Sequence, residues 1–373
     1  MPLLAKFYPW GLLLLLLVLL IAYLLPLFAF GLPAHRPSIV LYGFSILEEP
    51  ITEGILPAFQ RSWKQKTGQE VEFYTSFGGS GTIANLIRFG APAEVAIFSH
   101  NWDADKLKQA GLIQTDWTQF PHHGVVNRTP IVLVVRPGNP KRIHNFDDLT
   151  QLGVRIIHPD PQTSGAAYWS ILAEYGAFLL SRNPPDPIDA QDKLSRLWRN
   201  IAIFGSSASA SWRQFDIGFG DVLVTYEQQA VRNFGRGLSA DEIVAPTCTV
   251  YAEHPAVMFD RNIPQAKRPL ISAFLEFLWT DEAQRIFVKF GFRSVSTELN
   301  GANPHFLHLS SPLTIADLGG WPNAYHGIIE DVWEKKIIEK DETVVGTGLR
   351  SGLHPVPGCE ARGDPANSRR PDS

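Results

Sequence analysis

The sequence predicts an α/β protein in which a mostly parallel sheet is covered by helices. Strand and helix patterns alternate from residue 38 onward, with a strand at 39–44, a helical period through 51–63 and a second strand at 70–74. This alternation is typical of parallel sheets with helices on both faces. The chain of 373 residues exceeds the usual size of one core, so two domains or one discontinuous pair are expected.

The rest of the chain continues the alternation. Further strands are expected at 93–98, 130–136, 153–157, 201–204 and 220–227. Helices are expected at 103–110, from 163 to 179, at 190–199, from about 208 to 218, at 228–234, around 274–279, at 281–289 and around 321–339. The run at 130–136 is the strongest predicted strand, and a Pro-Gly-Asn-Pro turn ends it.

Both ends of the chain differ from this pattern. Residues 10–31 are almost wholly apolar, as in an export signal or an uncleaved membrane anchor, so residues 1–31 are assigned to one of these. Small residues at Ala29 and Gly31 favour cleavage after Gly31, while the length suits an anchor. Either way the remainder lies outside the cytoplasm. Residues 346–373 are rich in Gly, Pro, Ser and Arg and are expected to be disordered.

Composition excludes several classes of function. The net charge of −4 argues against a nucleic-acid binder, which needs a basic surface. Cys248 and Cys359 are too few for a disulfide scaffold or a Cys-based metal cluster. His122 and His123 are adjacent on a predicted loop, without a third ligand at a diagnostic spacing. No metal site and no cofactor are predicted.

Three helix entrances are rich in small neutral residues. They lie at 75–82, at 163–167 and at 205–211, each after a predicted strand, and none contains Lys, Arg, Asp or Glu. Free backbone N–H groups at a helix N-terminus bind anions, and glycine allows close approach of a ligand. Capping by a hydroxyl is the ordinary alternative at any one entrance. Together the three indicate helix N-termini that converge on one ligand.

The residues do not assemble into a catalytic site. The segment 78–82 lacks the second glycine of a G-x-S-x-G elbow and the lysine of a phosphate-binding P-loop. Asp221 and Glu227 are candidates for an acid pair, but ion pairs at the ends of a strand are the simpler interpretation. We therefore predict a binding protein with no catalytic residues.

Five motifs together resemble the periplasmic sulfate-binding proteins over roughly residues 38–340. These are GGSG at 78–81, VLVVRPGNP at 132–140, HPDPQTSGA at 158–166, GDVLVTYE at 220–227 and LGGW at 318–321. The resemblance implies the sulfate/thiosulfate-binding component of an ABC importer. It also implies a two-lobed periplasmic-binding-protein fold of type II, with mixed sheets and the ligand in the cleft between lobes. Lobe I would comprise 38–128 plus 229–340, and lobe II 129–228.

The resemblance also implies a ligand site. Family positions fall on Ser80, Ser164, Gly165, Ala166 and Ser207, which would donate through backbone N–H groups and, for Ser80 and Ser164, through hydroxyls. Three positions depart from the family. Tyr226 replaces a Trp, the segment Ser45-Ile46-Leu47 replaces a Tyr-Asp-Pro after the first strand, and Ala208 replaces an Arg. The full set of predicted ligand-binding residues is Ser45, Ile46, Ser80, Ser164, Gly165, Ala166, Ser207 and Tyr226.

The implied partners are sulfate or a similar oxyanion and a membrane permease, and the protein is expected to be a monomer. Two alternatives stay open. The same fold could bind phosphate, molybdate, tungstate or a small organic anion, or it could serve as an anchored anion-sensing domain.

Overall fold

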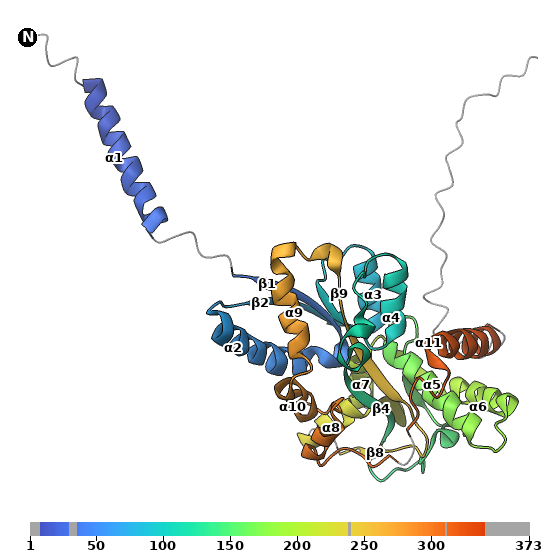
Figure 1. The fold of residues 1–373 in the computed structure, drawn as a ribbon. Helices are drawn as coiled ribbons and strands as arrows, with labels where there is room; N and C mark the ends of the chain where they lie inside the picture. The colour runs from blue at the N-terminus through green and yellow to red at the C-terminus, as the bar shows by residue number, and fades with distance from the viewer. Residues whose placement is uncertain (1–7, 30–35, 238–239, 310–311, 340–373) are drawn as a thin grey trace, which may run out of the picture.

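The computed structural model describes residues 8–29, 36–237, 240–309 and 312–339, with side chains of the first segment described for 13–23. Its centre is a nine-stranded mixed sheet (Figure 1). The strand order is β2 (Glu72–Gly78), β1 (Ser38–Phe44), β3 (Val95–Ile97), β9 (Tyr251–Met258), β4 (Val125–Val135), β7 (Val222–Tyr226), β5 (Ile156–Pro159) and β6 (Ile201–Gly205), and β8 (Glu242–Val244) also pairs with β4.

Two parallel groups of strands are joined through the antiparallel strands β4 and β9. β1 runs parallel to β2 and β3, and β5 runs parallel to β6 and β7. The first part of β4, up to Pro130, pairs with β9, and the part from Ile131 to Val135 pairs with β7. β4 therefore belongs to both groups. The sequence patterns indicated β4 but not β9.

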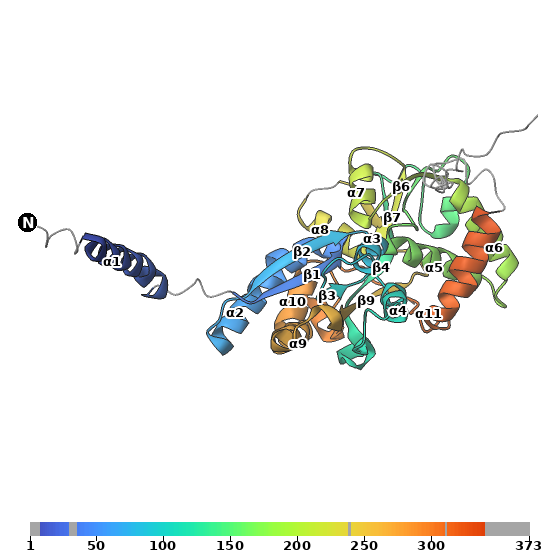
Figure 2. The same ribbon diagram turned by 90° about the horizontal axis from the view of Figure 1, so that it is seen from above.

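Helices cover both faces of the sheet, as Figures 1 and 2 show. They are α2 (Leu56–Thr67), α3 (Ser80–Arg88), α4 (Asn101–Gln109), α5 (Gly165–Leu180), α6 (Pro187–Arg199), α7 (Ala208–Asp216), α8 (Glu227–Gly235), α9 (Arg268–Phe277), α10 (Asp281–Lys289) and α11 (Gly320–Asn323). α11 continues into the π-helix η10 (Ala324–Ile338), and the short 3₁₀ turn η2 (Ser45–Leu47) follows β1. All strands and helices expected between residues 38 and 339 are present, most of them with shifted ends.

Local chemistry explains where several helices begin and end. The Asp186 carboxylate accepts hydrogen bonds from the N–H groups of Ile188 and Asp189, and Pro187 opens α6. α2 ends at Gly68, whose φ of 74° places it in the left-handed region that glycine tolerates. Such signals are short-range, which is why the sequence located these helices well.

Successive residues of the central strands pack into different cores. In β3, Val95 and Ile97 contribute to one cluster, while Ala96 faces a second cluster with Ile83 of α3 and Leu107 of α4. Because side chains alternate across a strand, a short run with both faces apolar is buried on both sides. The sheet is therefore the middle layer of the fold, and α3 and α4 are fixed against it.

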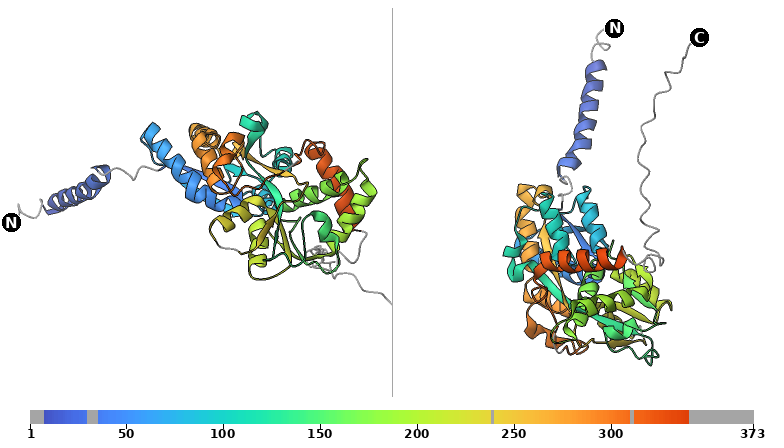
Figure 3. Two further views of the ribbon diagram at one scale, coloured as in Figure 1. Left: turned by 90° about the horizontal axis from the view of Figure 1, so that it is seen from below. Right: turned by 90° about the vertical axis from the view of Figure 1, so that its right-hand side faces the viewer.

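The two terminal regions were also the subject of predictions. The N-terminal helix α1 (Tyr8–Ala29) stands apart from the other elements in Figure 3, and Leu13 is 61% exposed. Among the described residues, no helix combines the length and apolar character needed to cross a membrane. The segment 346–373 and Cys359 lie outside the described residues, and Cys248 is not in a disulfide with any described residue.

The C-terminal helix η10 packs against α5 and α6, on the right of Figure 1. α5 and α6 belong to the segment 129–228, whereas η10 belongs to the segment 229–340. The division of the chain into two lobes at these boundaries stays a prediction.

Candidate functional site

The predicted ligand-binding residues lie where strands end and helices begin. Ser45 and Ile46 form the turn after β1, and Ser80 is the first residue of α3. Ser164 is the N-cap of α5, whose first residues are Gly165 and Ala166, while Ser207 is the N-cap of α7 and Tyr226 ends β7. Each position lies at or after the end of a strand of the central sheet, so the sheet sets their spacing.

The loops that precede the three helices meet at Gly79. A Cβ atom at Gly79 would lie 2.3 Å from the Thr163 carbonyl oxygen and 2.7 Å from that of Ser206. The Thr82 N–H donates to the Thr163 carbonyl at 3.3 Å, and the Thr163 hydroxyl donates to the Ser206 carbonyl at 2.9 Å. Only glycine fits at Gly79, and the entrances to α3, α5 and α7 are therefore in contact.

The turn that follows β1 reaches the same place. The Ser209 N–H in the first turn of α7 points at the Ser45 hydroxyl at 3.5 Å, a long contact. Ile46 is 4% exposed, so its side chain packs in the core and only its backbone can serve a ligand. The fold thus brings the predicted residues of β1, α3, α5 and α7 together.

Several backbone N–H groups at these entrances have no protein acceptor. In the part of the chain that the structure describes, the N–H groups of Ser80, Gly165, Ala166 and Ala208 donate to no carbonyl or side chain. Buried N–H groups are rarely left unpaired, and helix N-termini carry a partial positive charge. The arrangement is suited to an anion that accepts several hydrogen bonds at once.

The two N-cap serines differ in what their hydroxyls do. The Ser207 Oγ accepts a hydrogen bond of 3.1 Å from the Ala210 N–H, which is ordinary capping. Ser164 is 4% exposed and its side chain makes no capping bond. The Ser164 hydroxyl is therefore free to turn to a ligand, whereas that of Ser207 is already used.

Ser80 is tied to an acidic residue that the sequence did not single out. Its hydroxyl donates to Asp103 Oδ2 at 2.7 Å, and its Oγ accepts from the Ser99 N–H at 3.0 Å. Asp103 also pairs through Oδ1 with Lys106 Nζ at 2.8 Å. The Ser80 hydrogen is therefore directed away from the helix entrances, and its backbone N–H is the donor left for a ligand.

The environment of Asp103 fixes its charge. Burial by itself raises the pKa of the Asp103 carboxyl, but the charges of His100 and Lys106 and the hydrogen bonds from Lys106 and Ser80 hold the pKa below its ordinary value. Burial lowers the pKa of His100 to about 4, although Asp103 opposes this. At neutral pH, Asp103 is ionised and His100 is neutral. The negative charge behind Ser80 is balanced by Lys106.

Tyr226 is buried at the end of β7, and its phenol oxygen lies 2.8 Å from the Ser99 hydroxyl oxygen. Burial raises the pKa of the Tyr226 phenol, the hydrogen bond with Ser99 opposes the rise, and the charge of Asp103 adds to it. The phenol therefore keeps its proton at neutral pH.

Sequence reasoning missed Ser99, His100, Asp103 and Trp169. Ser99 follows the three-residue strand β3, and no motif surrounds it. The Trp169 indole N–H donates to the Ser99 carbonyl at 2.7 Å, from the second turn of α5. The available signal was a serine and an aspartate, Ser99 and Asp103, after a short buried strand. This signal indicates a site only once β3 is known to pair with β1.

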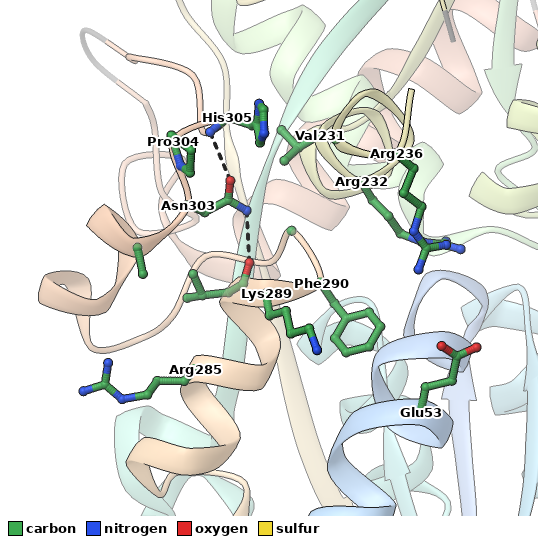
Figure 4. A pocket seen from close by; sticks show the side chains of 14 residues that line it. Glu53, Val231, Arg232, Arg236, Arg285, Lys289, Phe290, Asn303, Pro304 and His305 are labelled. Carbon is green, nitrogen blue, oxygen red and sulfur yellow. Dashed lines mark hydrogen bonds between the residues drawn. The ribbon is translucent and has the colours of Figure 1, made fainter. Parts of the chain in front are cut away.

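A pocket of about 520 Å³ lies elsewhere, between α8 and α10 (Figure 4). Arg232 of α8, Arg236 just after α8 and Lys289 of α10 line it, but both arginines form ion pairs with Glu49. None of the predicted ligand-binding residues lines this pocket. The helix entrances, where buried N–H groups of several helices lie unpaired among the described residues, are therefore the better candidate site.

Asp221 and Glu227, which could have formed an acid pair, are separately engaged. Glu227 accepts two hydrogen bonds of 2.7 Å from Arg293, and Asp221 pairs with Arg155 at 3.1 Å. The interpretation as ion pairs is confirmed. Among the described residues, no group of three or more His, Cys, Asp or Glu is placed to hold a metal ion.

Comparison with known proteins agrees with this geometry. The chain matches the family model described as bacterial extracellular solute-binding protein over residues 47–293. It is 34% identical over 275 residues to a sulfate-binding protein of Synechococcus elongatus, covering 72% of this chain and 77% of that one. It is 34% identical over 239 residues to a thiosulfate-binding protein of Pseudomonas aeruginosa, covering 62% and 70%.

A solved structure is also similar. A sulfate-binding protein from Mycobacterium tuberculosis superposes with a TM-score of 0.71 at 30% identity, covering 78% of this chain and 99% of that one. The fold and the convergent helix N-termini define a solute-binding protein with a two-lobed α/β fold. This chain belongs to the bacterial extracellular solute-binding protein family. The fold class predicted from the sequence is confirmed.

Proposed function

We propose that this protein binds sulfate, or a closely related tetrahedral oxyanion such as thiosulfate, outside the cytoplasm and delivers it to the permease of an ABC transporter. The observation that carries the proposal is the set of unpaired N–H groups at Ser80, Gly165, Ala166 and Ala208. The names of the similar proteins support it. The function is transport rather than catalysis.

The ligand is held by neutral donors rather than by ion pairs. The three entrance loops contain no charged residue between 75 and 82, 163 and 167, or 205 and 211. Asp103, the nearest carboxylate to Ser80, has its oxygens engaged by Ser80 and Lys106. A fully deprotonated oxyanion only accepts hydrogen bonds and meets donors there, whereas hydrogen phosphate leaves its proton without an acceptor.

Calorimetric titration at pH 8 tests this assignment with sulfate, thiosulfate, selenate, chromate, phosphate, molybdate and tungstate. We expect sulfate, selenate and chromate to bind, and phosphate to bind roughly ten- to a hundredfold more weakly, since a buried unpaired donor costs about 1–3 kcal/mol. Phosphate binding as tightly as sulfate would refute the assignment in favour of the phosphate alternative.

The N-terminal segment serves as the export signal in this proposal, and cleavage after Gly31 releases a monomeric protein. Retention of residues 10–31 would instead tether the protein and favour an anchored anion sensor. Mass spectrometry of the chain from an exporting host distinguishes the two, because a cleaved chain begins at Leu32. Light scattering of the same sample measures whether it is a monomer.

A further inference from the structure

Ser99 joins three elements of the candidate site. It is 1% exposed, and each of its polar groups makes a hydrogen bond. Its N–H donates to Ser80 Oγ at 3.0 Å, its carbonyl accepts from Trp169 Nε1 at 2.7 Å, and its Oγ lies 2.8 Å from the Tyr226 phenol oxygen. A Cβ atom at Gly165 would lie 2.6 Å from Ser99 Cβ and Oγ. Ser99 therefore sits between the starts of α3 and α5 and the end of β7.

The direction of the hydrogen bond between Ser99 and Tyr226 decides what the phenol presents to a ligand. A phenol has one hydrogen to donate and also accepts hydrogen bonds. If Tyr226 donates to Ser99, its hydrogen is used and a lone pair is left for the ligand. If Ser99 donates to Tyr226, a phenol lone pair is occupied and the phenol hydrogen is left free.

An anionic ligand selects the second direction. The Ser99 hydroxyl has no other acceptor among the described residues, and the Tyr226 phenol has no other hydrogen-bond partner there. With an oxyanion at the helix entrances, a chain from the Ser99 hydroxyl through the phenol to the ligand lets each hydrogen bond polarise the next. The opposite direction would turn a phenol lone pair toward negative charge.

We infer that Ser99 is a positioning residue for oxyanion selectivity, which donates to Tyr226 so that the phenol presents only its hydrogen to the ligand. The inference rests on the proposed function. It explains how a phenol can stand where the resembling family has an indole, whose N–H donates and has no lone pair in the ring plane. Ser99 thereby occupies the phenol lone pair that hydrogen phosphate would otherwise use.

A double-mutant cycle between Ser99→Ala and Tyr226→Trp tests this role, with the sulfate-to-phosphate affinity ratio as the readout. Ser99→Ala frees the phenol lone pair, so we expect the ratio to fall roughly tenfold, as for one gained or lost hydrogen bond to a charged group. In the Tyr226→Trp background the same Ser99→Ala change should leave the ratio high, because the indole donates only.

Ser170→Ala is the matched control, since Ser170 is a fully buried serine of α5 whose hydroxyl has no partner among the described residues. It should leave the ratio unchanged. The inference is overturned if Ser99→Ala keeps the wild-type ratio, or if the double variant is as unselective as Ser99→Ala alone. If the unmodified protein itself binds no oxyanion, the proposed function fails instead. Should Ser99→Ala not fold, Ser99→Cys replaces it: its thiol is a weak donor, so the ratio should still fall, and a wild-type ratio in Ser99→Cys contradicts the inference.

Discussion

The Ser80 hydroxyl donates a hydrogen bond of 2.7 Å to Asp103, and both residues are 1% exposed. This bond holds the first residue of α3 against α4, behind the candidate site. The Lys106 side chain is 46% exposed, so water can replace Asp103 as its hydrogen-bond partner. The buried Ser80 hydroxyl has no such replacement for the Asp103 acceptor.

Asp103→Asn should therefore lower stability more than binding. We expect the free energy of unfolding to fall by about 1–3 kcal/mol, because a charged hydrogen-bond acceptor is lost in a buried place. Urea denaturation measures the change. Asp105→Asn, on the same helix but less buried, is the control and should have a small effect. An Asp103→Asn protein as stable as the unmodified one would show that the charged hydrogen bond to Ser80 contributes nothing to the free energy of unfolding.

Ser164→Ala and Ser207→Ala should separate binding from stability. The Ser164 hydroxyl makes no capping bond, so its removal should weaken sulfate binding by about 1–3 kcal/mol and leave unfolding nearly unchanged. The Ser207 hydroxyl caps α7, so its removal should reduce the free energy of unfolding by about 1 kcal/mol. Calorimetry and denaturation of both variants measure the pattern, and the reverse pattern would contradict our assignment of the two hydroxyls.

Gly79→Ala should weaken ligand binding by keeping the helix entrances apart. An added Cβ would lie 2.3 Å from the Thr163 carbonyl oxygen, a distance that forces the backbone to move. The neighbouring Gly78→Ala is a close control, because its nearest contact would be the Ile83 side chain at 3.6 Å.

Small-angle scattering measures the effect of Gly79→Ala on closure. We expect saturating sulfate to reduce the radius of gyration of the unmodified protein and of Gly78→Ala, since under the proposed function the two lobes close over the ligand. The Gly79→Ala protein should show a smaller reduction. If all three respond alike, the approach at Gly79 does not limit closure.

Buried histidines predict a loss of stability in mild acid. Burial lowers the pKa of His100 to about 4, and burial with the charge of His100 lowers that of His254 well below its ordinary value of 6.5. Each histidine takes up a proton near pH 6.5 only when unfolded. Acidification from that pH toward 4 therefore favours the unfolded state, by about 1.4 kcal/mol per pH unit for each histidine. The lowered pKa of Asp103 acts only below this window.

His100→Asn should flatten this dependence, since Asn can still cap α4 but does not titrate. Between pH 7 and pH 5, the loss of unfolding free energy should shrink by roughly 2 kcal/mol relative to the unmodified protein. The exposed His305→Asn is the control. Parallel stability curves for His100→Asn and the unmodified protein would show that His100 is not held neutral by burial.

The sequence located most elements because their signals are local. α10 was expected at 281–289 and spans these residues, since its apolar period and its Thr280 cap are contiguous in the chain. β9 was missed because Glu253, His254 and Pro255 interrupt its pattern. These three residues are accommodated by pairing with the distant strand β4, which no local pattern reveals.

The candidate site was predictable where glycine and serine mark helix starts. The part contributed by Ser99 was not, because β3 has three residues and its value depends on pairing with β1 in the register Leu41 to Val95. The role of the Ser80 hydroxyl also depends on distant contacts. A serine at a helix start looks the same in the sequence whether it faces a ligand or, as here, Asp103.

The hydrogen bonds that Ser99 makes to Trp169 and Tyr226 have a kinetic consequence. Ser80 and Tyr226 are almost completely enclosed, so we expect an oxyanion at the proposed site to leave only after these bonds and the contact between Thr82 and Thr163 have broken. The residence time of the ligand is then set by how often the protein opens. Sulfate and selenate present the same oxygens, so their dissociation rates should be nearly equal. A transporter that separates the two halves of the protein would release either anion without recognising the anion itself.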